Sequence, residues 1–250
     1  MFTEIISVDK YKIRREFVFV ILSGLFVGSL AMLNILGLSR LIDLSFTING
    51  TKIPLMVFVG VLPYPITFLC TDFISELYGK RRANMVVWVG LLMNMWVLFI
   101  LWFAGRLPEN PQVNSDAFFR IRELTFGATA ASMIAYLTAQ FVDVHVFHFF
   151  KKLTKGKHLW LRNNGSTLTS QLIDSIAVVL ITYYGAKAID LHPDTHVYSF
   201  LFMLIASNYF FKMVSALLDT IPFYIGVKWL SKYLNIDPVK EYHTEKYVNE

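Results

Sequence analysis

Four aspartates lie within or at the end of long apolar stretches of this chain: Asp72, Asp143, Asp174 and Asp219. Three of them precede a lysine by eight or nine residues, and Asp174 follows Asn164 by ten. At about 1.5 Å of rise per helical residue, each carboxylate would lie roughly 12–15 Å in from the cytoplasmic helix end, near the bilayer midplane. A carboxylate at that depth in a membrane is costly and by default serves binding or transport. The spacing therefore predicts a polar site to which four helices contribute at one level.

Amides and a cation accompany these aspartates in the pattern expected of a site for a polar ligand. Gln140 and Gln171 each precede an aspartate by three residues, so each shares a helix face with that carboxylate. Lys212 lies seven residues before Asp219 and could pair with it, or neutralise the site when it is empty. The alternative interpretation is structural pairing, in which one or two of the aspartates are neutralised by Lys212 or by nearby arginines and histidines.

Two further groups complete the candidate substrate site. The run 162–164, Arg-Asn-Asn, is expected to precede a helix that Ser or Thr at 166–167 would cap, and it serves either that cap and lipid phosphates or the substrate. Glu76 lies nearer the expected cytoplasmic surface, where it would form a gate or a salt bridge with Lys80 or Arg81. The candidate substrate-binding residues are Asp72, Glu76, Gln140, Asp143, Asn163, Asn164, Gln171, Asp174, Lys212 and Asp219.

The sequence gives little support for enzyme or metal chemistry. In Asp143-x-His145-x-x-His148 the two histidines share a helix face but the aspartate does not, so hydrogen-bonded histidines are favoured over a metal site. Cys70 is the single cysteine, which excludes an intrachain disulfide and a cysteine-based metal cage. The chain has no glycine-rich phosphate loop and no evident pair of nucleophile and base. We therefore expect no enzyme activity, no metal and no cofactor.

The elements that must position these residues are membrane helices. Apolar residues make up 55% of the chain and charged residues 16%, whereas a soluble domain has about a quarter charged residues. Six apolar runs are each long enough to cross a hydrocarbon core of about 30 Å, and in a bilayer such runs satisfy their backbone groups as helices. The predicted fold is an all-α integral membrane protein with six transmembrane helices, near 17–38, 54–71, 83–104, 124–149, 168–190 and 200–227.

Lysine and arginine predict the orientation of these helices. The two tails and the loops at 71–83 and 149–167 carry 16 of these residues, whereas the other three loops carry 6. This asymmetry predicts cytoplasmic termini, with an N-terminal tail at 1–16, a transport domain at 17–227 and a C-terminal tail at 228–250. The net charge of +5 comes from cations at helix ends and needs no nucleic-acid partner. We expect a multi-pass protein of the cell (inner or plasma) membrane, with the lipid bilayer as its surroundings.

Two local motifs predict helix geometry. Pro63-Tyr64-Pro65 falls in the middle of the run at 54–71, so that helix is expected to be kinked or broken there. The break would be either a simple kink or a device that presents backbone groups to a cavity. Gly24-x-x-x-Gly28 allows close helix approach, with packing within the chain favoured over a homodimer seam. Asn34 is expected to hydrogen-bond a neighbouring helix.

Two long polar motifs resemble a known family. The first is Pro65-Ile-Thr-Phe-Leu-Cys-Thr-Asp-Phe-Ile-Ser-Glu-Leu-Tyr-Gly-Lys-Arg81, and the second comprises segments 140–147, 160–167 and 170–175. Both are similar to the signature of the queuosine precursor transporter family, also called the vitamin uptake transporter family. The resemblance covers roughly 17–227 and agrees with the predicted six-span layout.

The resemblance implies import of 7-deazaguanine bases, namely 7-cyano-7-deazaguanine and 7-aminomethyl-7-deazaguanine. A carboxylate can accept the adjacent N–H and amino groups of a guanine-like edge, and amides can serve the carbonyl and the ring nitrogen. A second carboxylate would pair with the cationic aminomethyl group. The leading hypothesis is a secondary transporter with a midplane site that opens alternately to each side, because the chain has no nucleotide-binding motif.

Three alternatives to that function stay open. The chain could be the substrate-binding membrane component of an ATPase-coupled vitamin importer, or a transporter of another purine-like base. It could also be a membrane enzyme that uses the Asp and His cluster, which would require turnover of a ligand or a bound metal.

Overall fold

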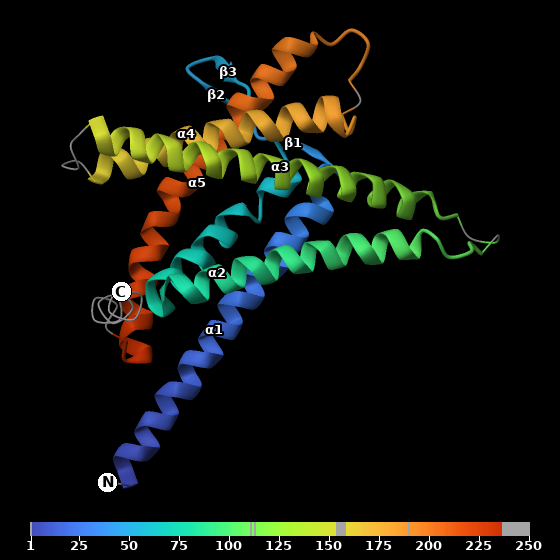
Figure 1. Cartoon of the computed structure of the whole chain (residues 1–250). Coiled ribbons are helices and arrows are strands. Elements are labelled where there is room, and N and C mark those ends of the chain that lie inside the picture. The colour runs from blue at the N-terminus through green and yellow to red at the C-terminus, as the bar shows by residue number, and fades with distance from the viewer. Residues whose placement is uncertain (1, 111, 113, 154–158, 190, 237–250) are drawn as a thin grey trace. The chain divides into compact units, whose positions relative to one another are not determined.

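The computed structural model describes residues 2–110, 112, 114–153, 159–189 and 191–236 (Figure 1). Within these ranges the side chains at 2–9, 80, 137, 140–141, 143–144, 147–148, 150–152, 159–164 and 166–167 are not described. The elements are α1 (Phe2–Leu36), β1 (Leu41–Asp43), β2 (Phe46–Ile48), β3 (Thr51–Ile53), β4 (Met56–Phe58), the 3-10 turn η1 (Val59–Val61), α2 (Tyr64–Ala104), α3 (Asp116–Leu153), α4 (Leu159–Leu180), the π turn η2 (Ile181–Gly185) and α5 (Val197–Leu234).

Long apolar helices dominate the described chain, as an all-α membrane protein requires. Four of them contain stretches long and apolar enough to cross a bilayer: Lys10–Leu36, Arg81–Ala104, Leu168–Gly185 and Val197–Leu234. Four of the six predicted runs coincide with these stretches, and the run at 124–149 lies within α3. The all-α membrane class is therefore confirmed, while the count of six spans and their orientation stay predictions.

The predicted helix over 54–71 is wrong in its first half. Strand β4 and turn η1 occupy 56–61, and α2 begins only at Tyr64. Pro63 therefore precedes the helix and Pro65 lies in its first turn, where a missing backbone N–H breaks no intrahelical bond. The expected kink in mid-helix at these prolines does not occur, because the prolines start the helix instead.

The break in α2 lies at Gly79, which has φ 82° and ψ 163°. These angles divide the helix into a first limb, 64–78, and a second limb, 80–104. The first limb is about 22 Å long at 1.5 Å per residue, which is shorter than a hydrocarbon core of about 30 Å. The first limb is therefore too short to cross the membrane as a straight helix by itself.

The described chain divides into two compact units. The first comprises the described residues within 2–32, 63–97 and 215–236. Its apolar core joins α1, the first limb of α2 and the C-terminal part of α5, through the side chains of Leu22, Phe26, Phe73, Ile74, Leu77, Leu230 and Leu234. Gly226 of α5 lies directly against the Phe73 ring, so this core depends on a close helix contact.

The Gly24 and Gly28 motif of α1 makes no helix contact within the first unit. An added Cβ at either glycine would meet no atom of this unit within 4 Å, leaving aside the helix's own backbone. Close approach to α1 in this unit occurs instead at Gly90 of α2, which contacts the side chains of Phe26 and Leu30. Both interpretations of the motif, packing within the chain and a homodimer seam, stay predictions.

Arginines tie the helix ends of the first unit together. The Arg15 guanidinium donates to the backbone carbonyl of Leu234 (3.1 Å), so it caps the C-terminal end of α5. The Tyr78 hydroxyl donates to the backbone carbonyl of Arg15 (2.9 Å). Arg82, just after the Gly79 break, pairs with Glu16 (3.1 Å). The break in α2 is thus joined to α1, and α1 to the end of α5.

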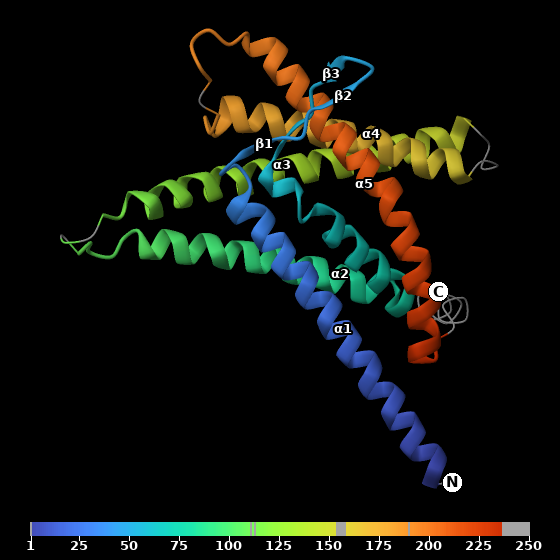
Figure 2. The same cartoon turned by 180° about the vertical axis from the view of Figure 1, so that it is seen from behind.

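The second unit comprises residues 33–62 and 98–214. Here α3 and α4 lie along one another, as both views show (Figures 1 and 2). The predicted hydrogen bond of Asn34 is confirmed, because the Ser132 hydroxyl of α3 donates to its side-chain oxygen (2.9 Å). Run 162–164 lies within α4 rather than before it, so the expected cap at 166–167 is wrong: the helix begins at Leu159.

Four short strands between α1 and α2 were not expected from the sequence. Strand β1 pairs antiparallel with β4, and β2 pairs antiparallel with β3. Asn49 and Gly50 form the tip with positive φ of 48° and 81°, as a tight hairpin turn requires. Between β1 and β2, side-chain and backbone hydrogen bonds from Ser45 lower the pKa of the Asp43 carboxyl below its ordinary value.

Candidate functional site

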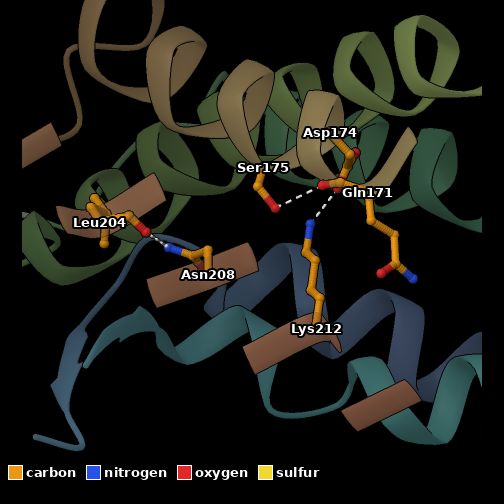
Figure 3. A network of polar contacts seen from close by, with 6 residues as sticks. All are labelled: Gln171, Asp174, Ser175, Leu204, Asn208 and Lys212. Atoms are coloured by element: carbon orange, nitrogen blue, oxygen red, sulfur yellow. Dashed lines mark hydrogen bonds and ion pairs between the residues drawn. The ribbon is translucent and has the colours of Figure 1, made fainter. Parts of the chain in front are cut away.

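A buried ion pair between Lys212 of α5 and Asp174 of α4 is the centre of the polar interior of the second unit (Figure 3). The Lys212 ammonium contacts Asp174 Oδ2 directly, and only 6% of the lysine side chain and 18% of the aspartate side chain are exposed. The interpretation that paired Lys212 with Asp219 is therefore corrected. Asp219 lies about 10 Å further along the same helix, whereas Asp174 comes from another helix that faces the lysine.

Burial makes this ion pair energetically demanding. Two charges removed from water are stable only when they contact each other closely, and removing one partner from such a pair costs about 3–5 kcal/mol. The Asp174 oxygens accept a charge-assisted hydrogen bond from the ammonium. The pair can therefore hold α4 against α5, and it also presents a carboxylate that another strong donor could use.

The amide of Gln171 lies one helical turn before Asp174 and is half-buried. Figure 3 shows its side chain extending from α4 next to the ion pair. Within the described part of the chain the amide makes no hydrogen bond, while its backbone carbonyl accepts the Ser175 hydroxyl (2.9 Å). Gln171 therefore offers an amide donor and acceptor on the same helix face as Asp174, and its role in a substrate site stays a prediction.

Further polar groups line α5 and the end of α4. Ser207, Asn208 and Lys212 are all buried, and their spacing places the last two one turn apart on α5. The Asn208 amide donates to the Leu204 carbonyl (2.8 Å), which leaves its oxygen as an acceptor. Thr182, in the π turn η2, is fully buried and its hydroxyl has no partner among the described atoms. The helices thus enclose polar groups where a membrane interior would otherwise be apolar.

The first unit contains a pair of aspartates, Asp72 and Asp219, which we call the acidic pair. Asp72 lies on the first limb of α2 and Asp219 on α5, near enough to interact electrostatically. Asp72 is exposed and Asp219 partly buried, and the described part of the chain offers neither a hydrogen bond. Glu76, one turn after Asp72, is also exposed. Its predicted salt bridge with Lys80 involves a side chain outside those described, and among the described side chains Glu76 makes no salt bridge with Arg81.

Several predicted site residues lie where only the backbone is described. Gln140 and Asp143 are on α3, and Asn163 and Asn164 are on α4. Their side chains lie outside the described ones, so their roles stay predictions. The convergence of all four aspartates at one level also stays a prediction, because Asp174 belongs to one compact unit and the acidic pair to the other.

Asn208 and Thr182 are polar residues of the interior that the sequence analysis did not select. Asn208 precedes Lys212 by four residues on a helix that is otherwise strongly apolar. That spacing was a usable signal, because a polar residue one turn from an intramembrane lysine shares its face. Thr182 gave no such signal, since a lone threonine in an apolar run usually bonds its own helix.

Comparison with known proteins identifies the family of this chain. A family described as "Putative vitamin uptake transporter" matches residues 58–226. A Bacillus subtilis protein named "Probable queuosine precursor transporter" is 30% identical over 160 residues, which cover 60% of this chain and 69% of the relative. The Escherichia coli "Queuosine precursor transporter" is 26% identical over 168 residues, covering 66% and 70%. A Haemophilus influenzae protein, also named "Probable queuosine precursor transporter", is 23% identical over 125 residues, which cover 50% of this chain and 51% of the relative. No solved structure matches the chain.

Proposed function

Because this chain belongs to the vitamin uptake transporter family, we propose that it imports queuosine precursors into the cell. It is a multi-pass protein of the cell membrane. The substrates proposed are 7-cyano-7-deazaguanine and 7-aminomethyl-7-deazaguanine. The names of the Bacillus and Escherichia relatives support this substrate class.

The buried Asp174 beside the Gln171 amide is the observation that carries this proposal. A guanine-like edge presents an N–H and an amino group side by side, and one carboxylate accepts both. The neighbouring amide can then serve the ring carbonyl. This part of the site requires only Asp174 and Gln171. Both residues lie on one face of α4, where the helix fixes their spacing.

Transport would proceed by alternating access, in which the site opens to one side of the membrane at a time. The proposed topology has six spans with cytoplasmic termini, based on the asymmetry of lysine and arginine. The exposed carboxylate of Asp72 and the nearby Asp219 are proposed to take the cationic aminomethyl group or a coupling cation. Asp143, Asn163 and Asn164 are proposed to complete the substrate site.

Ligand-induced stabilisation of the purified protein tests the substrate class. We expect both 7-deazaguanine bases to raise the unfolding temperature in proportion to the logarithm of their concentration above Kd. Adenine should have no effect, because its edge presents an acceptor where guanine presents an N–H donor. Equal stabilisation by adenine, or none by either 7-deazaguanine, would contradict the proposal.

Uptake into liposomes that contain this chain alone tests the transport mechanism and the site together. Asp174→Asn and Asp143→Asn should each abolish uptake while leaving folded protein in the membrane. Asp194→Asn is the matched control, because Asp194 is an exposed carboxylate between η2 and α5. Normal uptake by both site variants would refute the assignment. Binding without uptake by the wild-type chain, together with co-purifying ATPases, would favour the ATPase-coupled importer instead.

A further inference from the structure

We infer that the Lys212 ammonium is an internal competitor of the substrate, which occupies the Asp174 carboxylate in the empty protein and leaves it when the substrate binds. This inference rests on the proposed function, since it assigns the substrate to Asp174. It adds a step that the family match does not contain: the site is closed by one of its own side chains and opens by exchange.

Burial of the pair is the first argument for exchange. The ammonium contacts Asp174 Oδ2 directly, and 6% of the lysine side chain and 18% of the aspartate side chain are exposed. A guanine-like edge binds a carboxylate through both oxygens at once, and Lys212 already occupies Oδ2. Bidentate binding of the substrate at Asp174 therefore requires the lysine to move.

The chemistry of the two donors is the second argument. An ammonium and the paired N–H groups of a guanine-like edge both donate strong hydrogen bonds to a carboxylate. Exchange of one for the other keeps hydrogen bonds on Asp174 throughout, which offsets part of the cost of separating the buried ion pair. The remaining cost lowers the apparent affinity for the substrate, which lets a transporter release its substrate as well as capture it.

The surroundings of Lys212 supply the third argument. Its side chain has four methylene groups and therefore more rotatable bonds than the short Asp174 side chain. Asn208 lies one turn earlier on α5 and is buried, and its amide donates to Leu204. The Asn208 oxygen is therefore an acceptor on the same face, toward which the displaced ammonium can move.

Exchange also defines which ligands can enter. A successful competitor must replace a cation at a carboxylate, so it needs two adjacent N–H donors or a positive charge of its own. Guanine-like edges meet this requirement, whereas an adenine-like edge presents an acceptor beside its amino group. The selectivity of the site would then follow from Lys212 as much as from Asp174.

Binding measurements on the full chain in detergent test this inference, with 7-cyano-7-deazaguanine as the probe. Lys212→Met keeps the length of the side chain but removes the competing charge, so the probe should bind about tenfold or more tightly, since a competing closed state lowers apparent affinity. Asp174→Asn should lose binding, and Asp174→Asn combined with Lys212→Met should fold but not bind. Lys187→Met, at an exposed lysine, should bind as the wild type does.

Unchanged or weaker binding by folded Lys212→Met would overturn the inference, because the lysine would then be structural or a direct ligand of the substrate. If Lys212→Met does not fold, Lys212→Gln supplies the same test: tighter binding supports exchange, and unchanged or weaker binding overturns it. A wild-type chain that binds neither 7-deazaguanine would refute the proposed function itself. Failure of that function is thus distinguishable from failure of the exchange alone.

Discussion

Replacement of Gly79 by alanine should destabilise the protein through its backbone. Gly79 divides α2 at φ 82° and ψ 163°, a combination that is essentially restricted to glycine. A residue with a Cβ that is held in a sparsely populated region costs about 1–3 kcal/mol. Asparagine tolerates the left-handed helical region, but that region has ψ near +47° rather than 163°. Gly79→Asn should therefore be no better tolerated than Gly79→Ala.

Gly24→Ala and Gly28→Ala are matched controls for this change. Both glycines lie inside α1 with ordinary helical angles, and an added Cβ at either meets no atom of the described chain within 4 Å. Alanine is favoured over glycine in a helix by about 0.5–1 kcal/mol. The Gly79 and Gly24 variants should therefore differ by roughly 2–4 kcal/mol in free energy of unfolding.

Unfolding in mixed micelles, titrated with a denaturing detergent and followed by tryptophan fluorescence, measures this difference. The Gly79 variants should unfold at lower denaturant, and the Gly24 and Gly28 variants at the wild-type value or above it. If Gly79→Ala were as stable as Gly24→Ala, the break in α2 would not constrain the backbone, and the reasoning from its angles would be refuted.

Three further predictions concern packing and hydrogen bonds. Gly60→Ala should lower stability by about 1–3 kcal/mol, because its Cβ would lie 2.6 Å from the Cα atom of Gly37, just after α1; an unchanged unfolding temperature would contradict this. A double-mutant cycle of Asn34→Ala and Ser132→Ala should give a coupling of about 0.6 kcal/mol, and additive effects would exclude a direct bond. Arg15→Met should cost about 1 kcal/mol by uncapping α5, and faster proteolysis at that end would reveal it.

The membrane class and most helices follow from the sequence because hydrophobic length is a local property. A run of some twenty apolar residues can satisfy its backbone in a bilayer only as a helix, whatever surrounds it. The run at 54–71 departs from this rule because half of it forms strand β4 and turn η1, and its prolines begin a helix. Composition alone did not distinguish a proline that starts a helix from one that kinks it.

For the polar residues too, the sequence identified the candidates and the structure identified their partners. Depth counting selected Asp174, Gln171 and Lys212 as candidates, since an ionisable group in an apolar run is expensive wherever it lies. Sequence spacing suggested Asp219 as the partner of Lys212, because spacing reports only neighbours on one helix. The structure pairs the lysine with Asp174 instead, a choice that depends on which faces of α4 and α5 pack together.

By itself, then, the sequence determined that this is an all-α membrane protein with costly carboxylates inside apolar runs. Only the tertiary structure decided that Gly79 breaks α2, that Gly24 and Gly28 contact no other helix of the first unit, and that Lys212 pairs with Asp174. The physical reason is that hydrophobicity and helix period act along the chain, whereas backbone strain and ion-pair partners depend on contacts between segments distant in sequence.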